Sequence, residues 1–212
     1  MNALIIIDIQ NDFVFGGALA VAGGDQIVPV VNALQQKFEL VVATQDWHPA
    51  RHGSFAAMHP GKRPGEVIDL SGFPQVLWPV HCVQNSPGAQ FVAGLDLSRI
   101  EKVFQKGTDP EIDSYSGFFD NGHRKATGLG DYLESRGVSH VFICGLATDY
   151  CVKFTALDAR QLGFTVTLIE DACRGVNRQP GDSASALEEM RRAGVMVLQS
   201  KQVSSSRDGA QL

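Results

Sequence analysis

The sequence predicts an α/β fold with three layers, α/β/α, built on a mostly parallel sheet of about six strands. Short runs of consecutive apolar residues are typical of strands that are buried on both faces. Between these runs, apolar residues recur every three or four positions, which is typical of helices that cover a sheet. Strands that alternate with helices imply right-handed crossovers and therefore a parallel sheet. The length of 212 residues favours one domain.

The first half of the chain supplies two strands, a helix and a long connection. Residues 4–7 (Leu-Ile-Ile-Ile) predict the first strand, and the apolar run at 40–43 predicts the second. Between them, apolar residues at helical spacing predict a helix over 27–38, in which Pro29 lies early enough to be tolerated. The segment 46–97 is rich in Gly, Pro and His and has no clear period. So long a loop in a compact domain usually has a function.

The second half of the chain continues the alternation. Four further strands are expected, at residues 102–105, 141–144, 165–169 and 195–198. One helix is expected around residues 129–133, and a second has Val152, Thr155, Ala156, Ala159 and Leu162 on one face. A third is expected to run through Leu187 and Met190, with Asp182 as its cap. We therefore expect a single domain over residues 1–203, followed by a polar C-terminal tail at 204–212.

Charge and hydrophobicity exclude several classes of protein. The net charge is −5, and no basic tract is present, which argues against nucleic acid and anionic membranes as partners. No apolar run reaches the roughly 18–20 residues that a membrane-spanning helix needs. The N-terminus lacks the basic start and cleavage site of a signal peptide, so a cytoplasmic location is expected. The four scattered cysteines are then expected to be reduced.

Reactive side chains follow the predicted strands. Asp8 ends the first strand, Asp46 follows the second, Lys106 follows the third, and the fourth leads through a short turn to Cys151. In parallel α/β sheets, ligands bind beyond the carboxyl ends of the strands. We therefore expect these four side chains to meet in one crevice.

Cys151 stands at the predicted start of a helix. The partial positive charge and free N–H groups of a helix N-terminus lower the pKa of a thiol and can stabilise an oxyanion. The alternative is a small residue buried for packing, which is our interpretation of Cys144 and Cys173. The strand–turn–helix setting favours a nucleophile at Cys151.

Asp8 and Lys106 could assist such a nucleophile. Burial of Asp8 behind four apolar residues is costly unless its carboxylate is paired or does chemistry. Taken singly, Asp8 could bond loop amides and Lys106 could be a solvated surface residue. Beside a thiol, the aspartate can accept its proton and return it to a leaving amine, while the lysine holds the negative charges together.

A second group of side chains has the character of a metal site. In an extended segment Asp46 and His48 point to the same side, and His81 would complete a carboxylate/imidazole set suited to Zn²⁺, Fe²⁺ or Mn²⁺. The alternative is that loop histidines satisfy local hydrogen bonds. That is our interpretation of His59, His123 and His140, whereas His52 stays open.

Five segments in order along the chain indicate a family: IIIDIQNDF, QDWHPARHGSFA, WPVHCVQNSPGA, FQKGTDPEIDSYSGF and CGLATDYCV. They resemble the nicotinamidases (pyrazinamidases) of the isochorismatase-like cysteine hydrolase superfamily, from Leu4 to about Leu198. The segments around Asp8, Lys106 and Cys151 mark the superfamily. The DWHP and WPVHC segments are more specific to nicotinamidases.

The resemblance implies roles for individual residues. Asp8, Lys106 and Cys151 would form a catalytic triad, and Asp46, His48 and His81 would bind one divalent metal ion. A cis peptide between Leu146 and Ala147 would aim the amides of Ala147 and Cys151 at an oxyanion. The ring of the substrate would be enclosed by Phe13, Trp78 and Tyr115. Relatives differ in whether a further histidine or acidic residue joins the metal, which leaves His52 open.

The activity implied is hydrolysis of nicotinamide to nicotinate and ammonia through a cysteine thioester, without a nucleotide cofactor. Activity on pyrazinamide and a role in NAD salvage are also implied, and homo-oligomerisation stays open. One alternative is a sister amidase acting on a carbamoyl or ureido substrate, against which the metal residues argue. The other is a binding protein that has lost its chemistry, against which the retained Asp8, Lys106 and Cys151 argue.

Overall fold

The computed structural model of the chain describes residues 1–204 and contains a six-stranded sheet in the order β5-β2-β1-β6-β7-β8. Every neighbouring pair in this sheet is parallel, as the sequence predicts. Its strands are β1 (Asn2–Ile7), β2 (Leu40–Asp46), β5 (Lys102–Lys106), β6 (His140–Leu146), β7 (Thr165–Arg174) and β8 (Met196–Leu198). The predicted tail lies, from residue 205 on, outside the described residues.

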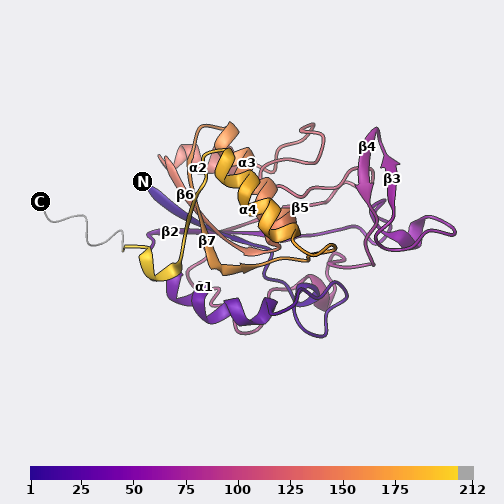
Figure 1. The fold of residues 1–212 in the computed structure, drawn as a ribbon, viewed down its shortest axis with the longest axis horizontal. Helices are drawn as coiled ribbons and strands as arrows, with labels where there is room; N and C mark the ends of the chain where they lie inside the picture. Colours follow the sequence, from indigo (N-terminus) through magenta and orange to yellow (C-terminus); the bar gives the residue numbers. More distant parts are fainter. Residues whose placement is uncertain (205–212) are drawn as a thin grey trace, which may run out of the picture.

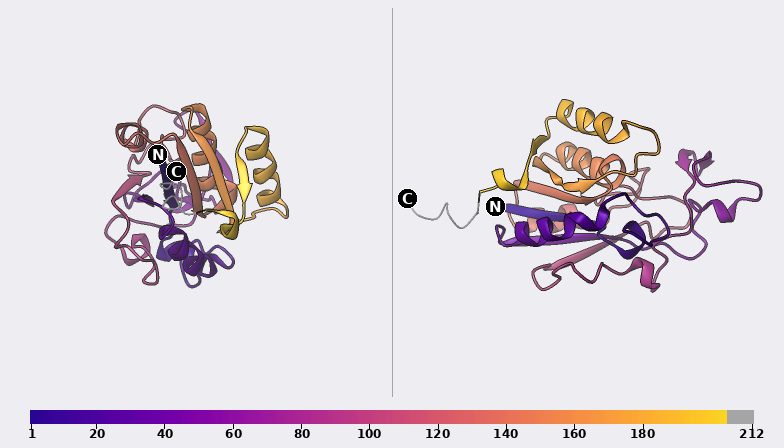
Figure 2. Two further views of the ribbon diagram at one scale, coloured as in Figure 1. Left: turned by 90° about the vertical axis from the view of Figure 1, so that its left-hand side faces the viewer. Right: turned by 60° about the horizontal axis from the view of Figure 1, so that its bottom comes forward.

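The helices cover both faces of the sheet, which confirms the three-layer prediction (Figures 1 and 2). Helix α1 (Val28–Gln35) lies on one face. The other face is covered by α2 (Leu129–Ser135), α3 (Lys153–Gln161) and α4 (Asp182–Arg192). None of the helices within residues 1–204 has the length and apolar character to span a bilayer.

The connections place a switch point at the centre of the sheet. From β1 the chain passes through α1 to β2, on one side, whereas from β6 it passes through α3 to β7, on the other. β1 and β6 are therefore neighbours whose following segments diverge. A crevice forms beyond the strand ends at such a point and is the usual ligand site of these folds. Asp8 follows β1 and Cys151 follows β6, so both lie at this point.

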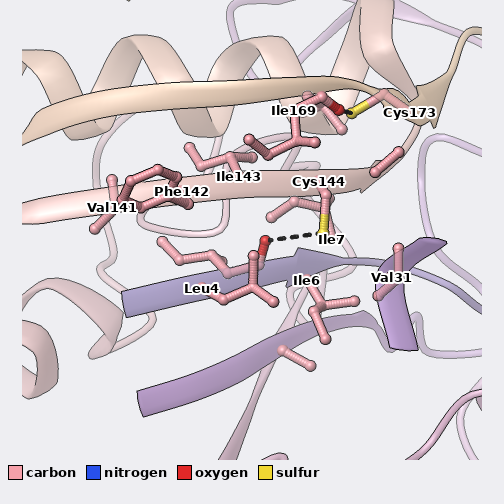
Figure 3. Close-up of a cluster of buried hydrophobic side chains, with 14 of the residues drawn as sticks. Leu4, Ile6, Ile7, Val31, Val141, Phe142, Ile143, Cys144, Ile169 and Cys173 are labelled. Atoms are coloured by element: carbon pink, nitrogen blue, oxygen red, sulfur yellow. Dashed lines mark hydrogen bonds between the residues drawn. The ribbon is translucent and has the colours of Figure 1, made fainter. Parts of the chain in front are cut away.

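The hydrophobic core lies between the sheet and its helices. The side chains of β1 from Ala3 to Ile7 are completely buried, because both faces of the central strand are covered. Figure 3 shows β1 residues beside Val31 of α1 and Cys144 of β6. Cys144 and Cys173 are both buried here as free thiols, which confirms their interpretation as packing residues.

The segment 46–97 contains an element that the sequence analysis missed. Strands β3 (Val67–Leu70) and β4 (Phe73–Val76) form a two-stranded antiparallel hairpin apart from the main sheet. Ser71 and Gly72 at its tip have positive φ angles of 54° and 90°, the conformation that closes tight hairpins. Seven of its eight side chains are partly or fully exposed, so no apolar run marks these strands. The Ser-Gly pair was the available signal.

Four helix boundaries differ from the prediction. A turn of π-helix over Thr148–Val152 precedes α3, so the helical run begins before Cys151. Gly181, with positive φ, occupies the cap position of α4, and Asp182 lies in its first turn. Leu162 follows α3 and is 37% exposed, whereas the other four residues of its predicted face point inward. α1 ends at Gln35, and Phe38 is buried beyond it.

Candidate active site and metal centre

The ends of three neighbouring strands bring the predicted acids and the lysine together. Asp46 and Lys106 are the last residues of β2 and β5 and are paired in register. Asp8 directly follows β1, and its positive φ of 47° turns the chain out of the sheet. All three side chains are almost completely buried. The three side chains therefore lie together beyond the strand ends, as the sequence predicts.

The Lys106 ammonium group is the centre of this cluster. Its Nζ lies 2.5 Å from Asp46 Oδ1 and 2.9 Å from Asp8 Oδ2. It also donates to the Ser114 carbonyl oxygen at 2.9 Å and lies 3.3 Å from the Cys151 sulfur. Burial alone would lower the lysine pKa, but Asp46 and Asp8 outweigh it and raise the pKa well above its ordinary value. Lys106 therefore stays charged.

Asp8 is held so that one oxygen faces the lysine. Thr44, on β2, donates its hydroxyl to Asp8 Oδ1 at 2.6 Å, which leaves Oδ2 toward Lys106. Burial raises the pKa of Asp8 above its ordinary value, and Lys106 acts in the opposite sense. A carboxylate whose pKa is raised is a better proton acceptor, which suits a general base. An oxygen of Asp8 and the Cys151 sulfur lie within 4.8 Å of each other.

The environment of Cys151 differs from the expectation in one respect. Burial raises the pKa of the Cys151 thiol well above its ordinary value, although Lys106 acts to lower it. The expectation of a lowered thiol pKa at a helix N-terminus is therefore wrong for this site. The sulfur is buried near Asp8 and Asp46, and its desolvation outweighs the effect of Lys106. The thiol is uncharged at rest and needs a base to lose its proton.

The turn that contains Cys151 presents two backbone amides. The peptide between Leu146 and Ala147 is cis, as the resemblance implies. The amides of Tyr150 and Val152 both donate to the Ala147 carbonyl oxygen. Within residues 1–204, neither the Ala147 amide nor the Cys151 amide donates to an acceptor outside this helical turn. The Ala147 amide, which precedes the turn, is therefore available to a ligand.

The predicted metal residues lie together beside this cluster. Asp46 Oδ2 is 3.5 Å from His48 Nε2 and 3.9 Å from His81 Nε2. The Nδ1 of His48 faces the Gly107 carbonyl oxygen at 2.9 Å, and that of His81 faces the Pro79 carbonyl oxygen at 2.8 Å. Because carbonyls only accept, both rings carry a proton on Nδ1 and keep a free lone pair on Nε2. This donor set fits a divalent metal ion.

Charge also favours a cation here. Burial raises the pKa of Asp46, but Lys106 and His48 lower it. Their effect is larger, so the pKa of Asp46 lies well below its ordinary value. Burial and the neighbouring His48 lower the pKa of His81 to about 4, so its ring is neutral near pH 7. Burial opposes protonation of His48, but Asp46 outweighs burial and raises its pKa. A metal ion would replace that proton.

His52 lies next to this set but has the opposite tautomer. Its ring centroid is 4.4 Å from that of His48. Its Nδ1 accepts a hydrogen bond from the Ser54 amide at 3.2 Å, so the proton of the neutral ring is on Nε2. The Nε2 atom is buried and has no hydrogen-bond partner within residues 1–204. His52 also belongs to a second candidate metal group, with His48 and Asp113, so its part in metal binding stays open.

The three histidines that we interpreted as structural lie away from this site. His59 bonds the Gly53 carbonyl oxygen, His140 bonds the Thr167 hydroxyl, and His123 pairs with Asp158. Those interpretations are confirmed.

A cavity of about 380 Å³, including its open mouth, joins the thiol to the metal residues. Phe13, Trp78 and Tyr115 all line it, in agreement with the resemblance. Trp78 donates its indole N–H to the Tyr115 hydroxyl at 3.1 Å, which fixes both rings. Cys151, Ala147, Asp46, His48 and His81 lie on its walls. One small aromatic molecule could therefore contact thiol, amides and metal residues together.

Several residues of the site were missed by the sequence analysis. Tyr150 and Asp113 line the cavity, and the completely buried Phe55 packs against the rings of His48, His52 and His81. Gln10 and Thr44 are buried polar residues beside the strand-end acids. A polar residue within an otherwise apolar run was a usable signal for Thr44. No periodicity marks Phe55, Asp113 or Tyr150, because they lie outside the regular strands and helices or within an irregular helical turn.

Comparison with known proteins gives consistent matches over nearly the whole chain. The model of the isochorismatase domain family matches residues 2–202. A nicotinamidase of Escherichia coli K12 is 55% identical over 200 residues, covering 92% of this chain and 93% of that protein. The solved structure of an Acinetobacter baumanii nicotinamidase/pyrazinamidase has a TM-score of 0.92 at 47% identity, covering 94% and 96% of the two chains. A Pyrococcus horikoshii pyrazinamidase in complex with zinc has a TM-score of 0.78 at 43% identity, covering 93% and 98%.

Proposed function

The chain belongs to the isochorismatase family, and on that premise we propose that it is a nicotinamidase that hydrolyses nicotinamide to nicotinate and ammonia. The observation that supports this most is the single cavity in which Cys151 faces Asp46, His48 and His81, with Lys106 behind them. The similarity to nicotinamidases from two bacteria supports the same substrate. Pyrazinamide is a second expected substrate, since a pyrazinamidase is among the similar structures. Nicotinate release would serve cytoplasmic NAD salvage.

In the first half of the reaction Asp8 accepts the thiol proton of Cys151. The sulfur attacks the carboxamide carbon, a C–S bond forms, and the carbonyl oxygen becomes an oxyanion. The amides of Ala147 and Cys151 donate to that oxygen. Asp8 then returns the proton to the amine, the C–N bond breaks, and ammonia leaves a thioester on Cys151.

In the second half water replaces the amine. Asp8 accepts a proton from water as it attacks the thioester carbon, and the C–S bond breaks to release nicotinate. The proton on Asp8 then returns to the sulfur. The Lys106 ammonium lies 3.3 Å from the sulfur and 2.9 Å from Asp8, so it is placed to stabilise each negative charge as it forms.

Asp46, His48 and His81 would hold one divalent metal ion, with zinc, iron and manganese all suited to these ligands. When bound, the ion would coordinate the pyridine nitrogen of nicotinamide and so orient the ring. Phe13, Trp78 and Tyr115 would pack around that ring, and the carboxamide would then face Cys151. Alignment of this kind can contribute several kcal/mol to a lower barrier.

The substrate class is tested by ammonia release from nicotinamide and from benzamide. Benzamide has the same ring size and carboxamide but no ring nitrogen. We expect kcat/KM of the metal-loaded enzyme to be far higher for nicotinamide. Comparable values would mean that the ring nitrogen is not recognised. No ammonia from either amide, with release from a carbamoyl or ureido compound, would favour the sister-amidase alternative.

A further inference from the structure

Gln10 fills a gap in the sheet beside Asp46. The ladder between β1 and β2 ends at Ile6 and Ala43, but β2 continues to Asp46. After Asp8 the main chain turns away, and at Gln10 it pairs instead with Phe91. The backbone groups of Asp46 on this side therefore have no strand beside them.

The side-chain amide of Gln10 takes the place of the missing strand. Its Oε1 accepts a hydrogen bond from the Asp46 amide at 2.8 Å, and its Nε2 donates to the Asp46 carbonyl oxygen at 2.8 Å. The second Nε2 hydrogen goes to the Ala89 carbonyl oxygen at 2.9 Å. A primary amide presents the same donor and acceptor as a peptide group, so this pair imitates a strand ladder. The side chain is completely buried.

Asp46 is thereby held from both sides. On the other side β5 pairs with it in register, and the next amide, that of Trp47, donates to the Lys106 carbonyl oxygen. A fixed backbone lets the short Asp46 side chain serve two partners at once. Its Oδ1 contacts Lys106, and its Oδ2 faces His48 and His81.

We propose that Gln10 is a positioning residue for the metal centre, acting through the backbone of Asp46 without touching the metal. The inference rests on the proposed function of Asp46 as a metal ligand. Residues that orient ligands in this way typically change metal affinity about 10–100-fold when they are replaced. Gln10 also lies two residues after Asp8, so one segment aligns the proton acceptor and the metal ligand.

A matched control exists in Gln45. It is also buried, and it donates to the same Ala89 carbonyl oxygen at 2.9 Å, but it does not bond the backbone of Asp46. Gln10→Met removes the amide, whereas Gln10→Glu keeps its shape and the acceptor for the Asp46 N–H. Gln45→Met removes a buried amide of the same kind and should retain near wild-type zinc affinity.

The experiment is zinc titration of the chelator-treated proteins against a chromogenic competitor, with urea unfolding of each metal-free variant. We expect Gln10→Met and Gln10→Glu to lose at least about tenfold in zinc affinity. Unchanged affinity in both Gln10 variants, or an equal loss in Gln45→Met, would overturn the inference. If Gln10→Met does not fold, the zinc affinity of Gln10→Glu alone tests the inference. Ammonia release by the wild type is measured separately, so a failed nicotinamidase assignment leaves the zinc comparison intact.

Discussion

At the scale of residues, Lys106 connects two sets of side chains that the sequence analysis treated separately. Its ammonium contacts Asp8 and Cys151 of the proposed triad and also Asp46 of the proposed metal set. A buried ammonium with two carboxylates leaves one uncompensated negative charge when both are ionised. This charge resists formation of a thiolate, which agrees with the raised pKa of Cys151.

The pH dependence of thiol alkylation tests that electrostatic account. Because burial raises the thiol pKa above its ordinary value of 9.0, we expect iodoacetamide to modify Cys151 of the metal-free protein slowly at neutral pH. The rate should still be rising with pH above 9.0. Peptide mass spectrometry at each pH gives the rate for this cysteine alone. A rate that levels off below pH 7 would restore the lowered pKa expected from the helix end.

Asp8→Asn removes both the proton acceptor and the negative charge of Asp8, and the two losses affect different measurements. The amide cannot accept the thiol proton, so nicotinamide turnover should be lost. The negative charge of Asp8 raises the thiol pKa, so its removal should move the alkylation profile to lower pH. Turnover near the wild-type rate would remove Asp8 from the role of base.

At the scale of elements, the ends of the strands determine where the site lies. Asp46 and Lys106 could be predicted because apolar runs locate buried strands, and parallel strands end at one edge. The hairpin β3–β4 and the tautomers of the histidines could not, since they depend on contacts within the irregular segment 46–97. The same holds for the π-turn at Cys151, since nothing in its residue spacing distinguishes it from an α-helical turn.

Gly107, directly after β5, shows how closely the end of β5 approaches His48, which follows β2. Its φ is +64°, and an added Cβ would lie 2.3 Å from a ring carbon of His48. Gly107→Ala should therefore displace His48 and weaken zinc binding at least about tenfold. Zinc titration of the purified variant measures this.

Gly137→Ala is the matched control. Gly137 has a similar φ of +67°, but nothing lies within 4 Å of the added Cβ. It should lower the free energy of unfolding by about 1–2 kcal/mol and leave zinc affinity unchanged. If Gly107→Ala binds zinc like Gly137→Ala, the contact with His48 does not control the metal site.

At the scale of the whole molecule, buried titratable groups lie together in the crevice at the edge of the sheet. The free energy of unfolding therefore depends on pH. The pKa of His81 falls from 6.5 to about 4 on folding, because of burial and His48. The native state then binds fewer protons than the unfolded state between these values. The contribution of His81 is complete above pH 6.5 and is lost as pH falls toward 4, by at most about 3 kcal/mol.

This prediction is tested by urea unfolding of the metal-free protein between pH 7 and pH 4, with His81→Asn as the comparison. The wild type should lose more stability on acidification than the variant, since asparagine does not titrate. Raised pKa values at His48 and Asp8 act in the opposite direction in both proteins. Parallel curves would show that His81 is not buried as a neutral ring.

The three layers and their order follow from the alternation of apolar runs, so the fold as a whole was predictable from the sequence. The roles of single residues came from their places at the strand ends and from the resemblance, and they remain proposals. Their central claim is that the Cys151 thiol forms a covalent bond to the substrate. Acid quenching of the metal-loaded enzyme during nicotinamide turnover, followed by peptide mass spectrometry, tests it directly. We expect a nicotinoyl group on the peptide that contains Cys151, and no turnover by Cys151→Ala. Nicotinate formation by Cys151→Ala near the wild-type rate, with no acylated Cys151 in the wild type, would contradict the account.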